Sequence, residues 1–478
     1  MRRGRLSMLA LASVSVTLLP GIDSAALVAQ VPGPLAGPPV RGLATSDTLR
    51  LDLPRSVGLA LERATPVLLG REVVRLTGSA LLESYGRFLP DARTGAVAFS
   101  ESGNLLLSST ALRASSASFY GAAWTLSTAV NVFNGLRDRE HLRASLLERD
   151  GAQASLERAR EQVTFDVTQA YYQVVLDRRL ESVARATLEL SATRERQLTE
   201  QVSAGTRAPP DLYRQQAQTK FDEAALIDAV NRVRADEYSL LRRLREAPGR
   251  PHVIAEPPAD TTPLDSAEFS VRALLGRALD ARPDLAAARQ HLAADTHELR
   301  VAEGARLPRV VMGFDWVRAG RVFDRETTGG VNQLNIDQKA LVPQLFGQGY
   351  FVGSLGLSWD IFDRWRARLD IDRASAFAYR DRLAAEDLQL QVESEVQRAV
   401  DDYRSTADRF TASSSGLRSA EEAFAAVQGR YEAGLATFVD VLTAQSALTQ
   451  SRALHEQAVT GLALQKAVLR YVAGTPPH

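Results

Sequence analysis

The spacing of apolar residues changes its period twice along the chain, each time from two to between three and four. Residues 310–316 alternate apolar and other side chains, which predicts a strand with one apolar face. Residues 392–410 carry apolar side chains at steps of three and four, which predicts a helix packed along one stripe. The same succession occurs earlier, with weaker alternation over 120–133 and helical spacing from Val163 onward.

The alternating stretches predict two strands in each half of the chain, within about residues 90–133 and about 308–362. A polar, Gly-rich stretch, 320–349, predicts the loop between the two later strands. Each half also begins with short helices that end at a Leu-Pro pair, Leu89-Pro90 and Leu307-Pro308. Proline cannot continue a helix, so the chain turns at both positions.

Two very long helices follow the strands. They are expected over about 134–204 and about 363–433, and neither stretch contains proline. About 70 residues at about 1.5 Å each correspond to a length on the order of 105 Å, which calls for coiled-coil packing. A shorter helix returns after each long one, over about 211–244 and about 440–472.

A glycine separates each long helix from its returning helix, so both pairs are predicted to be hairpins with Gly at the tip. The positions repeat at one offset, because Gly205 plus 229 is Gly434 and Asp211 plus 229 is Asp440. Taken alone, these residues also fit purely structural roles. Glycine commonly ends helices, and aspartate is a good N-cap for a returning helix.

The offset of 229 holds without insertion from Phe133/Phe362 to Ala229/Ala458, which predicts an internal duplication. The two Leu-Pro pairs differ by 218, so the strand loops differ by about eleven residues while the helices keep their length. The expected divisions are a signal peptide over 1–26, a Pro/Gly-rich leader over 27–50, repeat 1 over 51–247, a Pro-rich linker over 248–265 and repeat 2 over 266–473.

The N-terminus predicts export. Arg2, Arg3 and Arg5 precede an apolar run, 6–19, and small residues up to Ala26, where we expect signal cleavage. A retained amphipathic anchor is the alternative. There is no cysteine, which excludes disulfides, thiolate metal sites and a lipid anchor on an N-terminal Cys.

Composition narrows the function further. The formal net charge is zero with both signs interleaved, which argues against nucleic-acid binding. The six histidines are scattered and no phosphate-binding loop, dinucleotide fingerprint or nucleophile elbow occurs, so we expect no enzyme, cofactor or metal site. No apolar run is long enough for a transmembrane helix, so membrane insertion would have to use the strands.

Four such strands cannot close a barrel, because membrane barrels need about eight or more. Either the sheet is small and soluble, or several copies of the chain contribute their strands to one barrel. Three copies would give twelve strands, although the periodicity does not fix the number of copies. Pooling agrees better with the four tryptophans, which lie in or just after the strands as an aromatic girdle requires. They are Trp124, Trp316, Trp359 and Trp365.

The order of these parts, with the signature Tyr431-x-x-Gly434 followed by Asp440-Val-Leu442, resembles the TolC-type outer-membrane efflux protein family over 51–473. The resemblance implies an α+β membrane protein: a homotrimer with a twelve-stranded β-barrel in the outer membrane of a Gram-negative bacterium. A twelve-helix α-barrel would continue through the periplasm and dock an adaptor protein and an inner-membrane transporter. The implied function is a passive exit duct for efflux or type I secretion.

The resemblance also implies roles for the tip residues. Asp440 matches the acidic residue of the closed aperture, and Tyr431 and Asp211 match two members of its lock. The position of the lock arginine holds Ala436, whereas the equivalent in repeat 1 is Arg207, so we expect a rewired lock that keeps Tyr431–Asp211. A second acidic ring is not expected, because its position holds Thr443. The implied adaptor-docking residues are Gly205, Thr206, Gly434 and Leu435.

One other class fits the long helices: a periplasmic coiled-coil adaptor or structural protein. An adaptor should carry one hairpin flanked by strand modules, however, and this chain carries two hairpins preceded by amphipathic strands. The cargo is open to drugs, metal ions or polypeptides, because selection in such systems would lie mainly with the transporter and adaptor.

Overall fold

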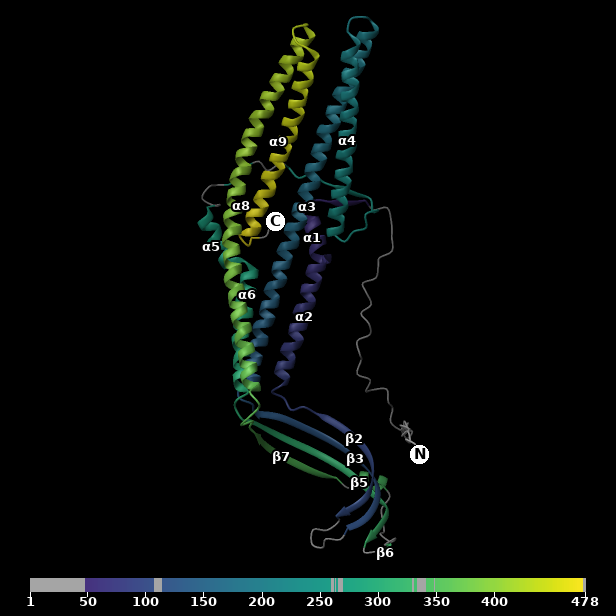
Figure 1. The fold of residues 1–478 in the computed structure, drawn as a ribbon, viewed down its shortest axis with the longest axis vertical. Coiled ribbons are helices and arrows are strands. Elements are labelled where there is room, and N and C mark those ends of the chain that lie inside the picture. The colour runs from purple at the N-terminus through teal and green to yellow at the C-terminus, as the bar shows by residue number, and fades with distance from the viewer. Residues whose placement is uncertain are drawn as a thin grey trace, which may run out of the picture. The chain divides into compact units, whose positions relative to one another are not determined.

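The structure is a computed structural model (Figure 1). It describes residues 48–106, 114–258, 262, 264, 270–328, 331–332, 341–347 and 349–475, without the side chains of 101–119 and 323–332. The expected signal peptide and nearly all of the leader therefore lie outside the described residues.

The described residues of the first half of the chain form four helices. Asp52 caps the first of them, because its carboxylate accepts a hydrogen bond of 2.8 Å from the Arg55 backbone N–H. The second helix ends at Gly86, shortly before Leu89-Pro90. The four are α1 (Leu53–Arg63), α2 (Thr65–Gly86), α3 (Arg137–Ser203) and α4 (Pro209–Arg243).

The second half has helices of the same lengths. α3 and its counterpart each contain 67 residues, and their returning helices each contain 35. The numbering of the counterparts is offset by 229 for these long and returning helices and by 218 for the short ones. The counterparts are α5 (Val271–Ala281), α6 (Pro283–Gly304), α8 (Arg366–Glu432) and α9 (Phe438–Val472).

The antiparallel sheet has the order β2-β3-β5-β7, with a two-residue extension on β5. Its register pairs Leu126 with Trp316 and Trp316 with Phe351, so these three side chains share one face. The strands are β2 (Arg93–Leu106), β3 (Ala114–Phe133), β5 (Arg309–Thr328), β6 (Val331–Asn332) and β7 (Tyr350–Ser358). A short helix, α7 (Leu341–Gly347), lies within the predicted loop.

A second, parallel sheet was not predicted from the sequence. β1 (Leu49–Leu51) pairs with β4 (His252–Ile254), which places two residues of the expected leader and three of the expected linker in regular structure. The Tyr171 hydroxyl donates to the Ala255 carbonyl beside it. Each strand has only 3 residues, and the two are far apart in the sequence, so no local period could reveal the pair.

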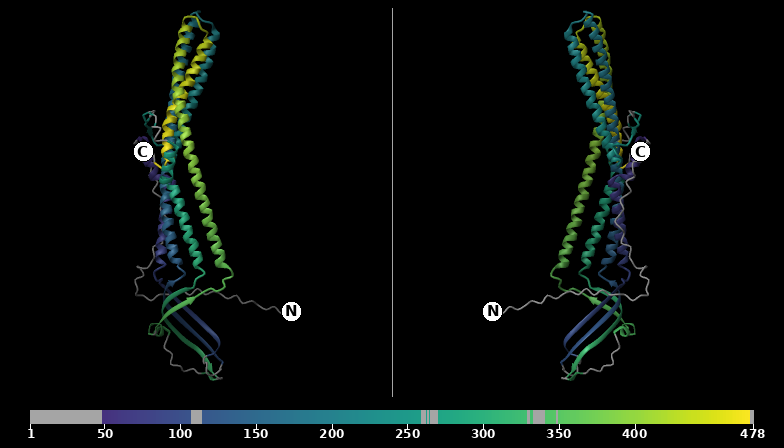
Figure 2. Two further views of the ribbon diagram at one scale, coloured as in Figure 1. Left: turned by 90° about the vertical axis from the view of Figure 1, so that its left-hand side faces the viewer. Right: turned by 90° about the vertical axis from the view of Figure 1, so that its right-hand side faces the viewer.

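The long helices have different neighbours near the sheet and near the hairpin tips (Figures 1 and 2). Next to the sheet, α3 packs between α2 and α6, and α6 packs against α8. Towards the hairpin tips, α3 packs between α4 and α9, and α9 packs against α8. The order is therefore α2-α3-α6-α8 near the sheet and α4-α3-α9-α8 near the tips.

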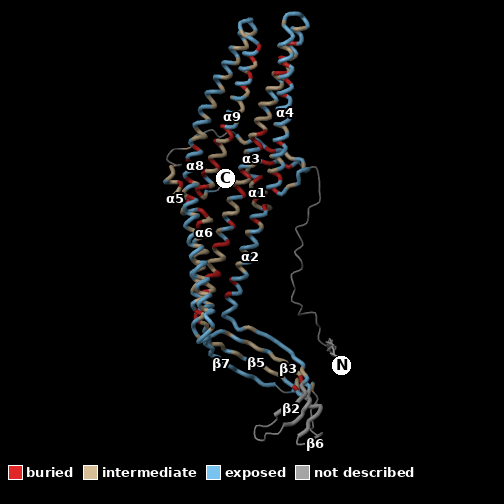
Figure 3. Tube along the Cα trace, in the orientation of Figure 1, coloured by how far each residue is buried: buried red, intermediate tan, exposed pale blue. Residues whose placement is uncertain are grey.

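Burial is concentrated in the helices; in the sheet, β2 and β7 are largely exposed and the central strands β3 and β5 are mostly of intermediate exposure (Figure 3). One apolar cluster surrounds Val167 and Tyr171 of α3, and a second surrounds Val396 and Tyr403 of α8. The long helices thus bury one stripe each against short neighbours. The remaining stripes and the sheet are left for other contacts.

Candidate functional site

Both hairpin tips have the same backbone conformation. Gly205 has φ of +72°, its N–H donates to the Val202 carbonyl at 3.0 Å, and the Thr206 N–H donates to the Gln201 carbonyl at 2.9 Å. This double closure ends a helix with a left-handed residue, which glycine adopts without a Cβ penalty. The tip is open around the glycine, since a Cβ there would meet nothing within 4 Å.

The second tip repeats this geometry at Gly434, where φ is +74° and the Leu435 N–H donates to the Arg430 carbonyl at 2.8 Å. The Leu435 side chain is 71% exposed. The two tips lie at the same end of the helices, opposite the sheet (Figure 1).

Asp440 is the third residue of α9 and not its N-cap. The expectation that this aspartate caps the returning helix is therefore wrong. Thr437 is the cap: its hydroxyl accepts from the Asp440 N–H at 3.2 Å, and the Asp440 carboxylate accepts from the Thr437 N–H at 2.8 Å. This capping box holds the exposed carboxylate in place. Hydrogen bonds from the Thr437 hydroxyl and N–H lower the pKa of Asp440 below its ordinary value.

Asp211 also occupies the third position of its helix, so the N-cap interpretation is wrong for both aspartates. The capping residue of α4 is Ala208, which offers no side-chain hydrogen bond. Asp211 instead lies 3.5 Å from Arg214 on the same helix. The first tip therefore lacks the capping box of the second.

The expected hydrogen bond between Tyr431 and Asp211 is not made. The Tyr431 hydroxyl is buried and, within the described part of the chain, has no hydrogen-bond partner. Arg207 supplies the contact, with its guanidinium 4.5 Å from the centroid of the Tyr431 ring. Burial raises the pKa of Tyr431, and the charge of Arg207 opposes that rise. The first tip thus reaches the second hairpin through a cation–π contact.

The tryptophans occupy two levels of the sheet. Trp124 and Trp316 meet edge to face at 5.3 Å, and Phe351 stacks on Trp316 at 5.9 Å. Trp359 and Trp365 follow β7 beside the helices and are 60% and 68% exposed. Trp316 lies seven positions along β5 from Arg309, about 24 Å at about 3.4 Å per residue, so the two levels are separated by about 18 Å in height if the strands are tilted by about 40°.

Sequence reasoning missed a buried polar network below the tips. Arg194 of α3 donates to the Gln445 carbonyl oxygen on α9, and Gln445 donates to the Ser191 hydroxyl at 3.0 Å. Ser191 in turn donates to Asp222 on α4. All four residues are buried, with Arg194 the most exposed at 9%. The available signal was that Ser191 and Arg194 lie on the same helix stripe as the buried Leu198.

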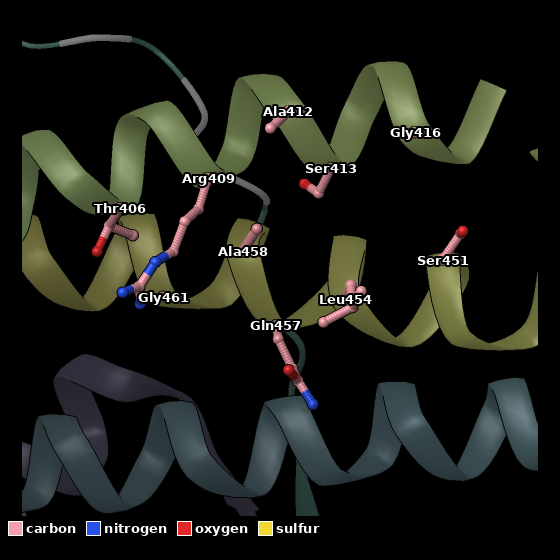
Figure 4. Close-up of a pocket in the computed structure, with 10 residues that line it drawn as sticks. All are labelled: Thr406, Arg409, Ala412, Ser413, Gly416, Ser451, Leu454, Gln457, Ala458 and Gly461. Carbon is pink, nitrogen blue, oxygen red and sulfur yellow. The ribbon is translucent and has the colours of Figure 1, made fainter. Parts of the chain in front are cut away.

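The second hairpin contains a cavity of about 590 Å³ between α8 and α9, bordered by Arg409 and Gln457 (Figure 4). Two of its lining residues are smaller than their counterparts in the first hairpin. At the offset between the repeats, Gly461 corresponds to Arg232 and Gly416 corresponds to Thr187. The space therefore marks a difference in packing between the hairpins.

The described residues contain no group of three or more His, Asp or Glu side chains placed to hold a metal ion. Among the same residues, no helix combines the length and apolar character needed to cross a membrane.

Long helical hairpins that continue into an antiparallel sheet are the arrangement expected from the resemblance to outer-membrane efflux proteins. Residues 274–475 match the family model described as outer membrane efflux protein. The TolC-type fold expected from the sequence is confirmed, and the match to the efflux family covers the second half of the chain. No match is found among curated protein sequences.

Solved structures with this fold are distant in sequence. The outer membrane protein VceC of Vibrio cholerae is 18% identical, with a TM-score of 0.73 over 88% of this chain and 96% of its own. CusC, in a structure described in terms of transmembrane channel formation, is 15% identical, with a TM-score of 0.74 over 91% and 96%. The CmeC outer membrane channel of Campylobacter jejuni is 15% identical, with a TM-score of 0.71 over 88% and 85%.

Proposed function

We propose that three copies of this chain form the exit duct of a tripartite efflux or type I secretion system. An exported chain would place its pooled strands in the outer membrane and its α-barrel in the periplasm. An adaptor protein and an inner-membrane transporter would deliver the cargo to the tips. The proposal rests on one observation. Among the described residues, the sheet and the row of helices each have two outer edges without a partner, and the two edges of each could pair between copies.

The sheet supports pooling through its edges. β2 contacts only β3, and β7 contacts only β5, among the described strands. The four strands alternate in direction, so β7 of one copy can pair antiparallel with β2 of the next. An open edge in lipid costs several kcal/mol per unpaired backbone group, and closure with twelve strands removes that cost. An even number of strands per copy keeps every junction antiparallel.

The two faces of the sheet support a membrane setting. The face that carries Trp124 and Trp316 also presents Phe314, Leu355 and Leu357, which are 47%, 73% and 72% exposed. The opposite face carries small or polar residues such as Thr125, Ser127, Asp315, Ser354 and Ser358. One apolar and one polar face on the same strands suit lipid outside and water inside.

The helices support the same assembly through the repeat. α3 packs against α6 within the chain, and their counterparts α8 and α2 form the two outer edges next to the sheet. Contacts of α3 with α6 therefore predict contacts of α8 with α2 of the next copy. His291 of α6 lies 3.2 Å from Glu148 of α3, and the equivalent residues are Val73 and Phe377. Both are exposed here, at 48% and 53%, and both are apolar.

The equivalence does not extend to the sheet end of α8. A Cβ on Gly135 would lie 2.2 Å from the Gly304 carbonyl oxygen, so the start of α3 approaches α6 too closely for any side chain. The counterpart of Gly135 is Arg364. The Val73–Phe377 level lies farther along the helix and is the better place to test the assembly.

Cross-linking tests the trimer without background thiols, because the chain has no cysteine. The variant Val73→Cys with Phe377→Cys, treated in membranes with a short bifunctional thiol reagent, should give covalent dimers and trimers. The two cysteines lie in different copies, so a closed ring of three makes the trimer the largest product. The measurement is the size of the products on a denaturing gel.

Matched controls separate this contact from chance collision. Either cysteine alone should give no product, and neither should Val73→Cys with Arg382→Cys, because Arg382 lies on another side of α8. A product ladder that continues past three would exclude a closed trimer. A soluble monomer after fractionation would favour the periplasmic structural alternative.

Asp440 is proposed as the acidic residue of the aperture, where three copies around one axis would attract cations. Asp440→Asn removes the charge but keeps an oxygen to accept from the Thr437 N–H, whereas Asp440→Ala also breaks the capping box. Both variants should lower cation selectivity in planar bilayers, and only Asp440→Ala should also lower thermal stability. Unchanged selectivity in both would remove Asp440 from the aperture.

Docking of the adaptor is proposed at the exposed tip residues Gly205, Thr206, Gly434 and Leu435. Cargo class stays open between drugs, metal ions and polypeptides. The membrane girdle is proposed at Trp124, Trp316, Trp359 and Trp365, with two of the four at each level described above.

A further inference from the structure

One positive charge lies on the apolar face of the sheet, the face that carries Trp124 and Trp316. Arg318 is opposite Trp124 in the register and two positions beyond Trp316 on β5, about 7 Å farther from the helices at about 3.4 Å per residue (Figure 1). It is the only charged residue on this face among the strand residues whose side chains the structure describes. An arginine that faces lipid is strongly unfavourable at the centre of a membrane and is tolerated near its surface. In the proposed membrane setting, Arg318 therefore lies at headgroup depth.

The guanidinium of Arg318 is held in place but lacks a counterion. It lies 4.7 Å from the centroid of the Trp316 ring, and its Nη1 donates to the Phe346 carbonyl at 3.2 Å. Its Nε is buried and has no hydrogen-bond partner within the described part of the chain. No described carboxylate lies within ion-pair distance of the guanidinium. Since a guanidinium carries five N–H donors, Arg318 can also bind an anion from outside the chain.

The short helix α7 is fixed beside this charge. Gly320 permits the approach, because a Cβ there would lie 2.9 Å from the Leu341 side chain and 3.1 Å from the Leu341 carbonyl oxygen. The side-chain amide of Gln344 accepts from the Arg321 N–H at 2.9 Å and donates to the Arg321 carbonyl at 3.1 Å. The pairing of β5 with β7 ends at Val317, so Gln344 takes the place of a neighbouring strand beyond that point.

The outer side of α7 is apolar and faces the same way as the arginine. Gly320 is two positions beyond Arg318, so the helix covers the same face of the sheet. α7 has no charged residue, and its Val342 and Phe346 side chains are 60% and 75% exposed. Acyl chains match these exposed apolar side chains, and a phosphate matches the guanidinium beside them. The combination fits a lipid with a phosphorylated headgroup.

We propose that Arg318 and α7 of each copy form a binding site for a phosphorylated lipid of the outer leaflet. The phosphate binds the Arg318 guanidinium and supplies the counterion that the arginine lacks. The acyl chains lie against Phe346 and the apolar face of the sheet. This inference rests on the proposed outer-membrane duct and adds to it one specific lipid contact in each copy.

Lipid retention by the purified trimer tests the site. The trimer is reconstituted in nanodiscs of phosphatidylcholine with lipid A, a phosphorylated glycolipid. Native mass spectrometry then counts the lipid A molecules that stay bound after release into detergent. Wild type should retain up to three per trimer, and Arg318→Gln should retain at least fivefold fewer. Arg321→Gln is the matched control, because it removes a charge from the same strand but from the opposite face, and its retention should equal that of wild type.

Three further measurements separate the parts of the site. Lipid A without its phosphates should be retained at least fivefold less by the wild-type trimer. Inorganic phosphate in excess should not displace intact lipid A, because it offers no acyl chains to the apolar side chains. Phe346→Ser should lower retention at least threefold and leave the trimer intact.

Equal retention by Arg318→Gln and wild type, or equal retention of lipid A with and without its phosphates, would overturn the inference. Displacement by inorganic phosphate would show an anion site without a lipid, and loss of the trimer in Phe346→Ser would show that a neighbouring copy covers α7. A chain that never enters the nanodisc as a trimer refutes the duct together with the site. Insertion and channel conductance with no effect of Arg318→Gln on retention refute the site alone.

Discussion

At the scale of single residues, the two tips share one backbone and differ in their caps. Thr437 of the second tip corresponds to Ala208 of the first, while the aspartate three residues later is present in both. The reciprocal hydrogen bonds therefore exist only at the second tip. The same contrast appears where the returning helices end: Arg245 has φ of +54°, and its counterpart is Gly474, with φ of +72°.

The cap difference predicts opposite effects of two substitutions. Thr437→Ala should destabilise the second tip by about 1 kcal/mol, because the hydroxyl that satisfies the Asp440 N–H is lost. Ala208→Thr should stabilise the first tip by a smaller amount, since Asp211 is already in place to complete a capping box. Hydrogen exchange of the first turns of α4 and α9 measures both effects. Faster exchange at α4 in Ala208→Thr would contradict the assignment.

At the scale of elements, α3, α6 and α8 are joined by His–Glu pairs and by a pair of carboxyl groups. His297 of α6 lies 2.7 Å from Glu140 of α3, and His141 of α3 lies 2.8 Å from Glu298 of α6. Farther from the sheet, Asp295 of α6 faces Asp381 of α8, and one Asp295 oxygen is buried without a hydrogen-bond partner among the described residues. A shared proton would satisfy that oxygen.

These contacts predict that the helices are more stable in mild acid. Burial and the neighbouring Asp381 raise the pKa of Asp295 to about 6, and Glu148 raises the pKa of His291. Arg380 faces the same carboxylates and opposes the rise of the Asp295 pKa. Both raised groups favour the protonated folded state, so their stabilisation is present at low pH and is lost as pH rises through about 6.

The measurement is the thermal midpoint of helix unfolding between pH 5 and 7.5. Wild type should lose stability as pH rises across this window, and Asp295→Asn should flatten the curve, because an amide keeps a hydrogen bond to Asp381 without titrating. His455→Gln is the matched control, since His455 lies elsewhere on α9. An identical slope in Asp295→Asn and wild type would remove the pair from the explanation.

At the scale of the whole molecule, one buried arginine connects the short helices to the long ones. Arg282 is 2% exposed and is bound to Asp284 and Glu395 at 2.7 Å each. Arg158 of α3 reaches the same Asp284 at 3.2 Å. Burial lowers the pKa of Arg282, but hydrogen bonds to the two carboxylates outweigh it and hold the pKa above its ordinary value.

Removing this charge should therefore cost much more than removing a surface charge. Arg282→Met keeps most of the volume but leaves the partly buried Glu395 without its arginine partner and Asp284 with Arg158 alone, a loss on the order of 3 kcal/mol. Arg75→Ala removes an exposed pair with Glu72, where less than about 0.5 kcal/mol is expected. Thermal unfolding followed by helical circular dichroism compares the two. Equal effects would mean that the Arg282 cluster is not an important connection.

The sequence predicted the fold because its signals repeat over long stretches. Period two over Val310–Trp316 and the three-four stripe through Val396 each involve many residues, and the TolC-type fold follows from their order. Details that depend on one partner could not be predicted. Arg194 resembles any solvent-facing helical arginine until Gln445, far along the chain, is placed beside it. The expected Tyr431–Asp211 hydrogen bond was wrong for the same reason, because Arg207 and Asp211 lie close together in the sequence and nothing local shows which of them contacts Tyr431.

The equal helix lengths set a limit on how this protein can change. Each long helix has 67 residues and each returning helix 35, so one inserted residue would displace a tip by about 1.5 Å and turn it by about 100°. A partner that binds all tips together requires them to lie at the same height, and a single insertion would move one tip out of line. Tags and reporter domains therefore belong in the strand loops, where the two halves already differ in length.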